Sequence, residues 1–449
     1  FFLNMKSYQS YVEIKTVTWA KDSHGLFDYE SKNVTFNKNK IESNSKVYKE
    51  GSEIIIKSSK DADFLASKSK ELKDSAQLFS IVAENEKNEN FFLKVEDNLT
   101  HEYNKNTSLF LIVRSLKNDD GTQKGYNLEL GDIIRLGRIE YRVIEFQDHN
   151  LKKSSMFNNN KSRPGVKVTP FNLIRKSVGF EKSDVKKQCR ICLMDETEVD
   201  EFLVNPCNCK GTSEHVHVKC LQDWISSKIK KKEHPGVTCT YWKKLICEVC
   251  KISLPDVVDF DGESEATEII PIQRPENPYI LLERVFYDKS KENAENAKTV
   301  VLLNLVDQTH SIKLGRGHEC DLRENDISVS RLHAFIKYVN GNFVMIDNNS
   351  KFGTLVLLRN PHKVERKKIA LQIGRTVLTF SLKQSSINNI PVFKSPNLMD
   401  KFAKALPKSI PGTKPTTTTT STKPKSTLLQ DVDNQPQNQD LNGSFLDDQ

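Results

Sequence analysis

The sequence has no long hydrophobic run. Apolar runs such as residues 109–113 and 300–303 are only four or five residues long, whereas a membrane-spanning helix needs about 20 apolar residues. The opening Phe1-Phe2-Leu3 is followed at once by polar residues, which is not the pattern of a signal-peptide core. We therefore expect no membrane span and an intracellular location, in the cytoplasm or the nucleus.

A large excess of charge of either sign is also lacking. The 67 Lys and Arg residues face 59 Asp and Glu residues, which gives a net charge of +8 over 449 residues. This mild excess is not typical of a dedicated nucleic-acid-binding protein. The basic segment 151–187 lacks the arginine or aromatic patterning that DNA binding would need, so no nucleic-acid partner is expected.

Cysteine is nearly absent outside one short segment. Eight of the nine cysteines lie between Cys189 and Cys250, and the ninth is Cys320. A disulfide framework suits small secreted chains, and we expect this chain to be neither small nor secreted. Clustered cysteines in an intracellular protein indicate metal binding.

The remaining patterns predict a multidomain, mainly β protein. From Ser52 onwards, short apolar or alternating runs are separated by polar turns, which is typical of β-sandwiches and barrels. Segments rich in Pro, Asn, charge or repeated polar residues separate these blocks. The predicted order is a polar segment at 1–45, a β-rich domain at 46–150, a basic linker at 151–187, a cysteine-rich domain at 188–255, an acidic and Pro-containing linker at 256–277, a β-sandwich at 278–385 and a disordered tail at 386–449.

One short internal echo links the two β blocks. Ile134-Arg-Leu-Gly-Arg138 resembles Leu371-Gln-Ile-Gly-Arg375, and a strand-like run follows each of them. A match of common strand residues over five positions can arise by chance. Whether the N-terminal block is a degenerate copy of the C-terminal one therefore stays open.

Four pairs of metal-ligating residues occur at zinc-site spacing. They are Cys189-x2-Cys192, Cys207-x-Cys209, His217-x2-Cys220 and Cys247-x2-Cys250. Such a pair can present both ligands to one ion from a tight turn, and zinc takes four ligands in tetrahedral geometry. Eight ligands therefore predict two closed zinc sites, which stabilise a fold and do not activate water.

The order and spacing of these ligands resemble the RING-CH, or RING-variant, zinc finger. The resemblance covers residues 189–250 and rests on Cys189-Arg-Ile-Cys192-Leu, Pro206-Cys-Asn-Cys-Lys-Gly-Thr212, His217-Val-Lys-Cys-Leu221, Trp224-Ile225 and Cys247-Glu-Val-Cys-Lys251. It implies a small cross-brace finger with two zinc ions. One ion would be held by Cys189, Cys192, His217 and Cys220, and the other by Cys207, Cys209, Cys247 and Cys250.

The plant homeodomain finger has the same ligand order and is the main alternative. It usually places its second pair further apart and carries an aromatic residue just before the seventh ligand, where this chain has Leu245-Ile246. The single residue between Cys207 and Cys209 favours the RING-CH finger, as does Trp224, four residues after Cys220.

Two other candidate ligands lie within this segment. His217 keeps the His-x2-Cys turn, so we expect His215 to be a solvated loop residue. Eight ligands already fill two sites, so Cys239 is expected to be a packed or spare thiol.

RING-type fingers present a shallow groove to a ubiquitin-conjugating enzyme, and the resemblance implies that Ile191 and Trp224 contact that enzyme here. Apolar residues recur at helical spacing over 221–229, which predicts an amphipathic helix after the sixth ligand. The alternative role for Ile191 and Trp224 is packing of the finger's small core. Lys251 follows the last ligand, where many RING fingers carry an arginine that orients ubiquitin.

Three motifs occur in order within the second β block. They are Leu314-Gly-Arg-Gly317, Ser328-Val-Ser-Arg-Leu-His-Ala334 and Asp347-Asn-Asn-Ser-Lys-Phe-Gly-Thr354. Their order and spacing resemble a forkhead-associated (FHA) domain, a β-sandwich whose loops bind phosphothreonine. The resemblance covers residues 279–382 and implies that fold for the block.

By this resemblance the phosphopeptide-binding residues are Arg316, Ser330, Arg331 and Lys351. The Arg316 guanidinium would donate to a doubly charged phosphate, and the Ser330 hydroxyl would add a second donor. His333 is expected to hold the loops in place. Phe352 stands where the family often has an asparagine that contacts the peptide backbone, so we expect altered or weak peptide specificity. The alternative is a sandwich that only makes protein contacts.

These patterns together indicate a RING-type ubiquitin ligase with no covalent intermediate. The finger offers no nucleophile, base or acid, so it would act by holding a charged conjugating enzyme near an acceptor lysine. Its partners would be that enzyme and, through the sandwich, phosphothreonine-containing proteins. The alternative is a non-catalytic zinc-binding adaptor whose finger and sandwich only bind proteins.

Overall fold

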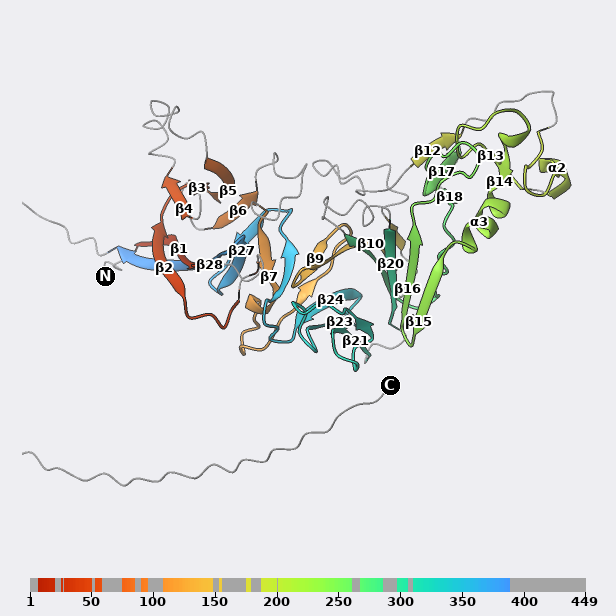
Figure 1. Ribbon diagram of the computed structural model, residues 1–449. Coiled ribbons are helices and arrows are strands. Elements are labelled where there is room, and N and C mark those ends of the chain that lie inside the picture. Colours follow the sequence, from red (N-terminus) through yellow and green to blue (C-terminus); the bar gives the residue numbers. More distant parts are fainter. Residues whose placement is uncertain are drawn as a thin grey trace, which may run out of the picture. The chain divides into compact units, whose positions relative to one another are not determined.

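The computed structural model describes the greater part of the chain, and most of what it describes is β-strand (Figure 1). The described residues are 7–20, 26, 28–50, 53–58, 75–84, 90–95, 108–147, 153–155, 175–178, 187–199, 201–260, 267–285, 297–305 and 310–387. The expectation of a mainly β protein is confirmed. The predicted disordered tail lies outside the described residues beyond position 387.

The largest sheet has thirteen strands. In spatial order they are β15 (Lys230–His234), β16 (Val237–Lys243), β20 (Ala297–Asn304), β19 (Tyr279–Val285), β10 (Ile139–Gln147), β9 (Ile133–Leu136), β25 (Thr354–Leu357), β7 (Phe110–Ile112), β27 (Ile369–Ile373), β28 (Thr376–Ile387), β1 (Ser7–Trp19) and β2 (Val34–Ile41), with β11 (Lys153–Ser155) beside β10. The order interleaves strands of the N-terminal block with strands of the C-terminal block.

Two five-stranded sheets pack on this large sheet and share hydrophobic cores with it. One contains β22 (Leu322–Arg323), β21 (Ser311–Gly315), β23 (Ala334–Val339), β24 (Asn342–Asp347) and β8 (Tyr126–Asn127). The other contains β26 (His362–Val364), β6 (Phe91–Val95), β5 (Ser75–Ala83), β3 (Ser45–Glu50) and β4 (Glu53–Ser58). Sandwich 1 is the name we give to the first of these sheets together with the part of the large sheet formed by β9, β10, β16, β19, β20 and β25. Sandwich 2 is the second of these sheets together with the part formed by β1, β2, β7, β27 and β28.

Both α-helices of the described residues lie in the cysteine-rich segment. It contains α2 (Glu196–Val199), α3 (Val218–Ser226), the 3-10 turn η4 (Gly211–Ser213) and the small hairpin of β13 (Leu203–Val204) with β14 (Val216–His217). A further 3-10 turn, η3 (Val113–Ser115), follows β7. Three short strands, β12 (Arg175–Val178), β17 (Val257–Phe260) and β18 (Thr267–Glu268), form a separate sheet. The segments predicted as linkers therefore contribute strands.

The two sandwiches exchange hairpins (Figure 1). The N-terminal hairpin β9–β10 lies between β19 and β25 of the C-terminal block, where Tyr141 and Val143 are buried in the core of sandwich 1. The C-terminal hairpin β27–β28 lies between β7 and β1 of the N-terminal block, where Leu378 and Phe380 are buried. Each block therefore completes the sheet of the other.

The two similar sequence segments, residues 134–138 and 371–375, lie in these exchanged hairpins. Each turns at a glycine followed by an arginine, and Gly137 and Gly374 both have positive φ, +59° and +50°. Glycine suits this left-handed backbone because it has no Cβ. At Gly137 the approach is also close, since a Cβ there would collide with Ser328. The two echo segments thus occupy equivalent positions, one in each sandwich.

Candidate functional site

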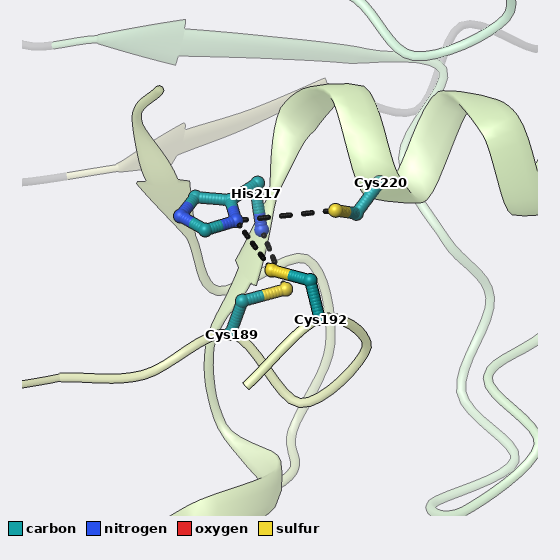
Figure 2. Close-up of side chains that lie close together, drawn as sticks. All are labelled: Cys189, Cys192, His217 and Cys220. Carbon is teal, nitrogen blue, oxygen red and sulfur yellow. Dashed lines mark hydrogen bonds between the residues drawn. The ribbon is translucent and has the colours of Figure 1, made fainter. Parts of the chain in front are cut away.

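The structure brings Cys189, Cys192, His217 and Cys220 together, with their ligand atoms all within 4.8 Å of one another. Figure 2 shows the His217 ring directed at two of the sulfurs, with Nδ1 at 3.2 Å from Cys192 Sγ and 3.9 Å from Cys220 Sγ. His217 precedes α3 and Cys220 lies in its first turn, so one helix start positions both ligands. Backbone N–H groups of Ile191 and His217 donate to Cys189 Sγ, each over 3.4 Å.

The second group consists of Cys207, Cys209, Cys247 and Cys250, again within 4.8 Å. Cys209 Sγ and Cys247 Sγ lie 3.7 Å apart. Four sulfurs held about 2.3 Å from a central ion in a tetrahedron are about 3.8 Å from one another, so this separation fits a zinc ion. The N–H of Ile252 is the largest of the influences that lower the pKa of the Cys250 thiol, to about 6, and this favours the thiolate that zinc binds.

The Cys-x2-Cys turns of the two groups have the same backbone geometry. In the first, Leu193 has φ of +66° and its N–H donates to the Cys189 carbonyl over 2.8 Å. In the second, Lys251 has φ of +60° and its N–H donates to the Cys247 carbonyl over 3.0 Å. We call the turns 189–193 and 247–251 the first and second knuckle. Each knuckle supplies two of the four ligands of its group, and four protein ligands leave no open position for water at a tetrahedral ion.

The two other candidate ligands lie outside both groups. Cys239 is buried in the core of sandwich 1, so the prediction of a packed thiol is confirmed. The His215 carbonyl accepts a hydrogen bond from the Arg190 N–H over 3.0 Å, and its ring belongs to neither ligand set.

The residue in the middle of each knuckle faces outwards because the cysteines turn inwards. Ile191 is 46% exposed, and Val249, at the same position of the second knuckle, is 65% exposed. Trp224 is partly buried, and Lys228 Nζ lies 5.2 Å from the centre of its ring. Lys228 also pairs with Glu248 of the second knuckle over 3.1 Å, which places the α3 end beside that knuckle. The repeated x2 spacing could have identified Val249, which sequence reasoning missed.

The predicted phosphopeptide-binding residues come from three neighbouring loops of sandwich 1. The Arg316 N–H donates to the Ser330 carbonyl over 3.0 Å, and the Lys351 N–H donates to Ser330 Oγ over 3.1 Å. Gly317 N donates to the Arg331 carbonyl over 2.9 Å. Arg316, Arg331 and Lys351 are exposed, so each of the three loops that meet at Ser330 carries a cationic side chain open to solvent, as a phosphate site would need.

His333 holds two of these loops together, as the sequence suggested. It is fully buried, its Nδ1 accepts from the Ser330 N–H over 3.1 Å, and its Nε2 lies 3.3 Å from the Gly353 carbonyl. Burial lowers the pKa of the imidazole, against an opposing effect of Asp347. Because Nδ1 accepts a hydrogen bond it carries no proton, so the ring proton lies on Nε2, within reach of the Gly353 carbonyl.

Asp347 organises the third loop, a role that sequence reasoning did not assign to it. Its buried carboxylate accepts from Ser350 Oγ over 2.5 Å, from Thr354 N over 3.0 Å and from Thr354 Oγ1 over 2.6 Å. Hydrogen bonds to a charged acceptor are stronger than neutral ones. They fix the loop that carries Lys351. The signal in the sequence was the spacing of one acid and two hydroxyls, Asp-x2-Ser-x3-Thr.

An N-terminal turn also reaches this loop. Asp28 Oδ2 lies 3.4 Å from Lys351 Nζ, and the Tyr29 ring packs against Gly353 so closely that a Cβ there would clash. The Tyr29 hydroxyl donates to Gln372 Oε1 over 3.2 Å, and the Arg114 guanidinium lies 3.7 Å from the ring centre. Sequence reasoning had assigned no role to this polar segment.

Comparison with known proteins finds two domains in the chain. The RING-variant domain model matches residues 189–250, and the FHA domain model matches residues 312–380. The chain therefore contains both predicted domains, and the RING-variant domain binds two zinc ions.

Several curated proteins are similar to part of the chain. The E3 ubiquitin-protein ligase MARCHF7 of Rattus norvegicus is 27% identical over 175 residues, which are 38% of this chain and 22% of that protein. The probable E3 ubiquitin-protein ligase MARCHF10 of Homo sapiens is 29% identical over 129 residues, 27% and 15% of the two chains. The ERAD-associated E3 ubiquitin-protein ligase DOA10 of Saccharomyces cerevisiae is 36% identical over 62 residues, 14% and 4% of the two chains. The chain spans about a fifth of the length of MARCHF7.

The expectation of a cytoplasmic or nuclear location is wrong. Of the relatives named above, MARCHF10 and DOA10 are membrane-associated ligases. Among the described residues, no helix is both long and apolar enough to cross a bilayer. The error arose because the expectation was drawn from the shortness of apolar runs and the lack of a signal-peptide core, and a protein can associate with a membrane without a span of its own.

Proposed function

We propose that the chain is a RING-type ubiquitin ligase whose finger binds a charged ubiquitin-conjugating enzyme. The observation that carries the proposal is the exposure of apolar side chains on the finger: Ile191 and Val249 project from the two knuckles, and Trp224 of α3 is only partly buried. Partly exposed aromatic and aliphatic anchors are typical of binding surfaces. The similarity of the finger to ligases from animals and yeast supports it further.

The finger would position the charged conjugating enzyme and would take no part in making or breaking bonds. The two zinc ions stabilise the knuckles and α3, and both are fully ligated by the protein. Ile191 and Trp224 would bind the conjugating enzyme, and Lys228, held by Glu248, would cover one face of the Trp224 ring. Holding the enzyme's charged end next to an acceptor amine raises the transfer rate by proximity and orientation.

Truncation of the aromatic anchor tests this role. We expect Trp224→Ala in the full chain to slow discharge of a ubiquitin-charged conjugating enzyme onto free lysine by about 30-fold, because loss of such an anchor costs about 2 kcal/mol. Ile191→Ala should act in the same direction. A panel of conjugating enzymes is assayed, with zinc content measured for each variant.

The matched control is Ile327→Ala, which truncates an aliphatic side chain that is 77% exposed on sandwich 1. It should leave discharge unchanged. Absence of discharge with every conjugating enzyme, from a wild-type chain holding two zinc ions, would favour the adaptor. Normal discharge by Trp224→Ala would place the binding surface elsewhere.

We also propose that the FHA loops bind phosphothreonine peptides and so recruit substrates. The support is the convergence of the Arg316, Ser330 and Lys351 loops, which His333 and Asp347 fix in place. Arg331 lies next to Ser330 and would add a further cation. The tie between Asp28 and Lys351 means that a phosphate would compete with a carboxylate for this lysine.

Arg316→Ala should weaken phosphopeptide binding by at least about tenfold, since a hydrogen bond to a charged group contributes about 1.5–3 kcal/mol. Ser330→Ala should weaken it as well. Binding is measured by anisotropy with a library of phosphothreonine peptides and its unphosphorylated counterpart. Arg366→Ala, which removes an exposed arginine from sandwich 2, is the control. Equal affinity of the wild-type chain for both libraries would refute the role.

A further inference from the structure

The long gap between the sixth and seventh zinc ligands folds into a hairpin that joins the sheet of sandwich 1. β16 pairs antiparallel with β20 in continuous register, from Val237 opposite Leu303 to Lys243 opposite Ala297. β20 pairs in turn with β19. The outer strand of the hairpin, β15, is exposed along its whole length. The finger is therefore connected to the sandwich through a shared sheet, in addition to the chain that links them.

Both faces of β16 are buried, which an independent finger would not require. Cys239 points into the core of sandwich 1. Trp242 points the other way and packs in a second core with Ile225 of α3 and with Val300 and Leu302 of β20. Side chains of the finger and of the sandwich thus share one hydrophobic core, and separating them would expose it to water.

Ion pairs fix the segment that follows the finger. Lys298 Nζ on β20 lies 2.6 Å from Asp256 Oδ2. Arg274 bridges Glu145 of β10 and Glu268 of β18, over 2.5 Å each. The side chains of all these residues are buried or mostly buried. The segment 256–277, predicted as a linker, is therefore tied to sandwich 1 at both ends of its described part.

We propose that the β15–β16 hairpin holds the finger at a fixed position on sandwich 1, so that ubiquitin is transferred to lysines at a set spacing from a bound phosphothreonine. This inference rests on the proposed function. A flexible tether would give an effective concentration that changes only slowly with the length between two sites. A rigid junction fixes the distance between the phosphate-binding loops and the bound conjugating enzyme. That distance then determines which lysine of a bound substrate is modified fastest.

The first test uses a series of peptides that carry one phosphothreonine and one lysine, separated by semi-rigid Pro-rich spacers of increasing length. The wild-type chain should modify one narrow range of spacings at least tenfold faster than the shortest spacing. Thr240→Pro, which removes a backbone donor in the middle of β16, should flatten this dependence. Thr240→Val is the matched control, because it keeps the backbone donor and the strand conformation.

Two parallel measurements separate the inference from the function on which it rests. Discharge onto free lysine reports the finger alone, and phosphopeptide affinity reports the loops alone. Active discharge and binding with no preferred spacing in the wild-type chain would overturn the inference. Absence of discharge with every conjugating enzyme would overturn the proposed ligase function.

Hydrogen exchange on the wild-type chain tests the junction without any variant or enzyme. Amides of β16 should be protected to the same degree as those of β20, because the two strands would open together. Fast exchange of β16 beside a protected β20 would show a detachable finger and would overturn the inference. Hydrogen exchange therefore still tests the fixed position of the finger if the Thr240→Pro variant releases zinc and fails to fold.

Discussion

We expect Arg142→Glu to lower the free energy of unfolding by about 3–5 kcal/mol, because it would place two buried acids together in sandwich 1. Arg142 of β10 lies opposite Glu283 of β19, with Nη1 at 3.8 Å from Glu283 Oε2, and the arginine is among the most deeply buried large side chains. Burial raises the pKa of the Glu283 carboxyl, and the Arg142 charge opposes that rise. The change is measured by equilibrium denaturation of the full chain.

The same pair tests the hairpin exchange between the sandwiches. Glu283→Arg in the Arg142→Glu background should restore much of the stability, because the pair is only inverted. If each block instead used its own hairpin, β28 would lie beside β19. When the two similar segments are aligned at Gly137 and Gly374, Thr379 is the residue equivalent to Arg142, so Thr379 would then face Glu283. The double variant would then show no rescue. A coupling free energy near zero in this cycle would therefore refute the exchange.

Side chains that differ between the hairpins explain why each lies where it does. Tyr141 donates a hydrogen bond to buried Glu324, and the equivalent residue in the other hairpin is Leu378, which cannot. Conversely, Thr376 of β28 shares a hydrogen bond of 3.0 Å with Thr18 of β1. The sequence predicted two similar strand pairs from local pattern. It could not predict their partners, since these depend on single polar contacts between residues far apart in the chain.

The metal centres were predictable because their chemistry is local. Pairs of ligands two or three residues apart must meet in a turn, and the structure assembles the eight residues in the two predicted sets. The hairpin between Cys220 and Cys247 was not predictable in this way. Residues 230–234 are all polar and exposed and show no alternation that indicates a strand. Their extended conformation follows from pairing with β16, and β16 is itself held in place by its pairing with β20.

Loss of one zinc ligand should affect more than the finger. Cys247→Ser is expected to release the second zinc ion, measured as zinc per chain by plasma mass spectrometry, and to unfold the second knuckle. Structural zinc sites contribute on the order of 10–16 kcal/mol of apparent binding free energy to folding, which exceeds the stability of a typical domain. Discharge of a charged conjugating enzyme should be lost with it.

The hydrophobic core shared by the finger and sandwich 1 determines which strands lose stability when the second zinc ion is released. Cys247 belongs to the same buried cluster as Trp242 and Leu302, so β16 and β20 should lose hydrogen-exchange protection in Cys247→Ser. Sandwich 2 has a separate core containing Phe380, and β28 should keep its protection. Cys239→Ser is the matched control, a buried cysteine outside both ligand sets that should keep both zinc ions. Loss confined to the finger, with β20 unchanged, would mean that the zinc sites stabilise the finger alone.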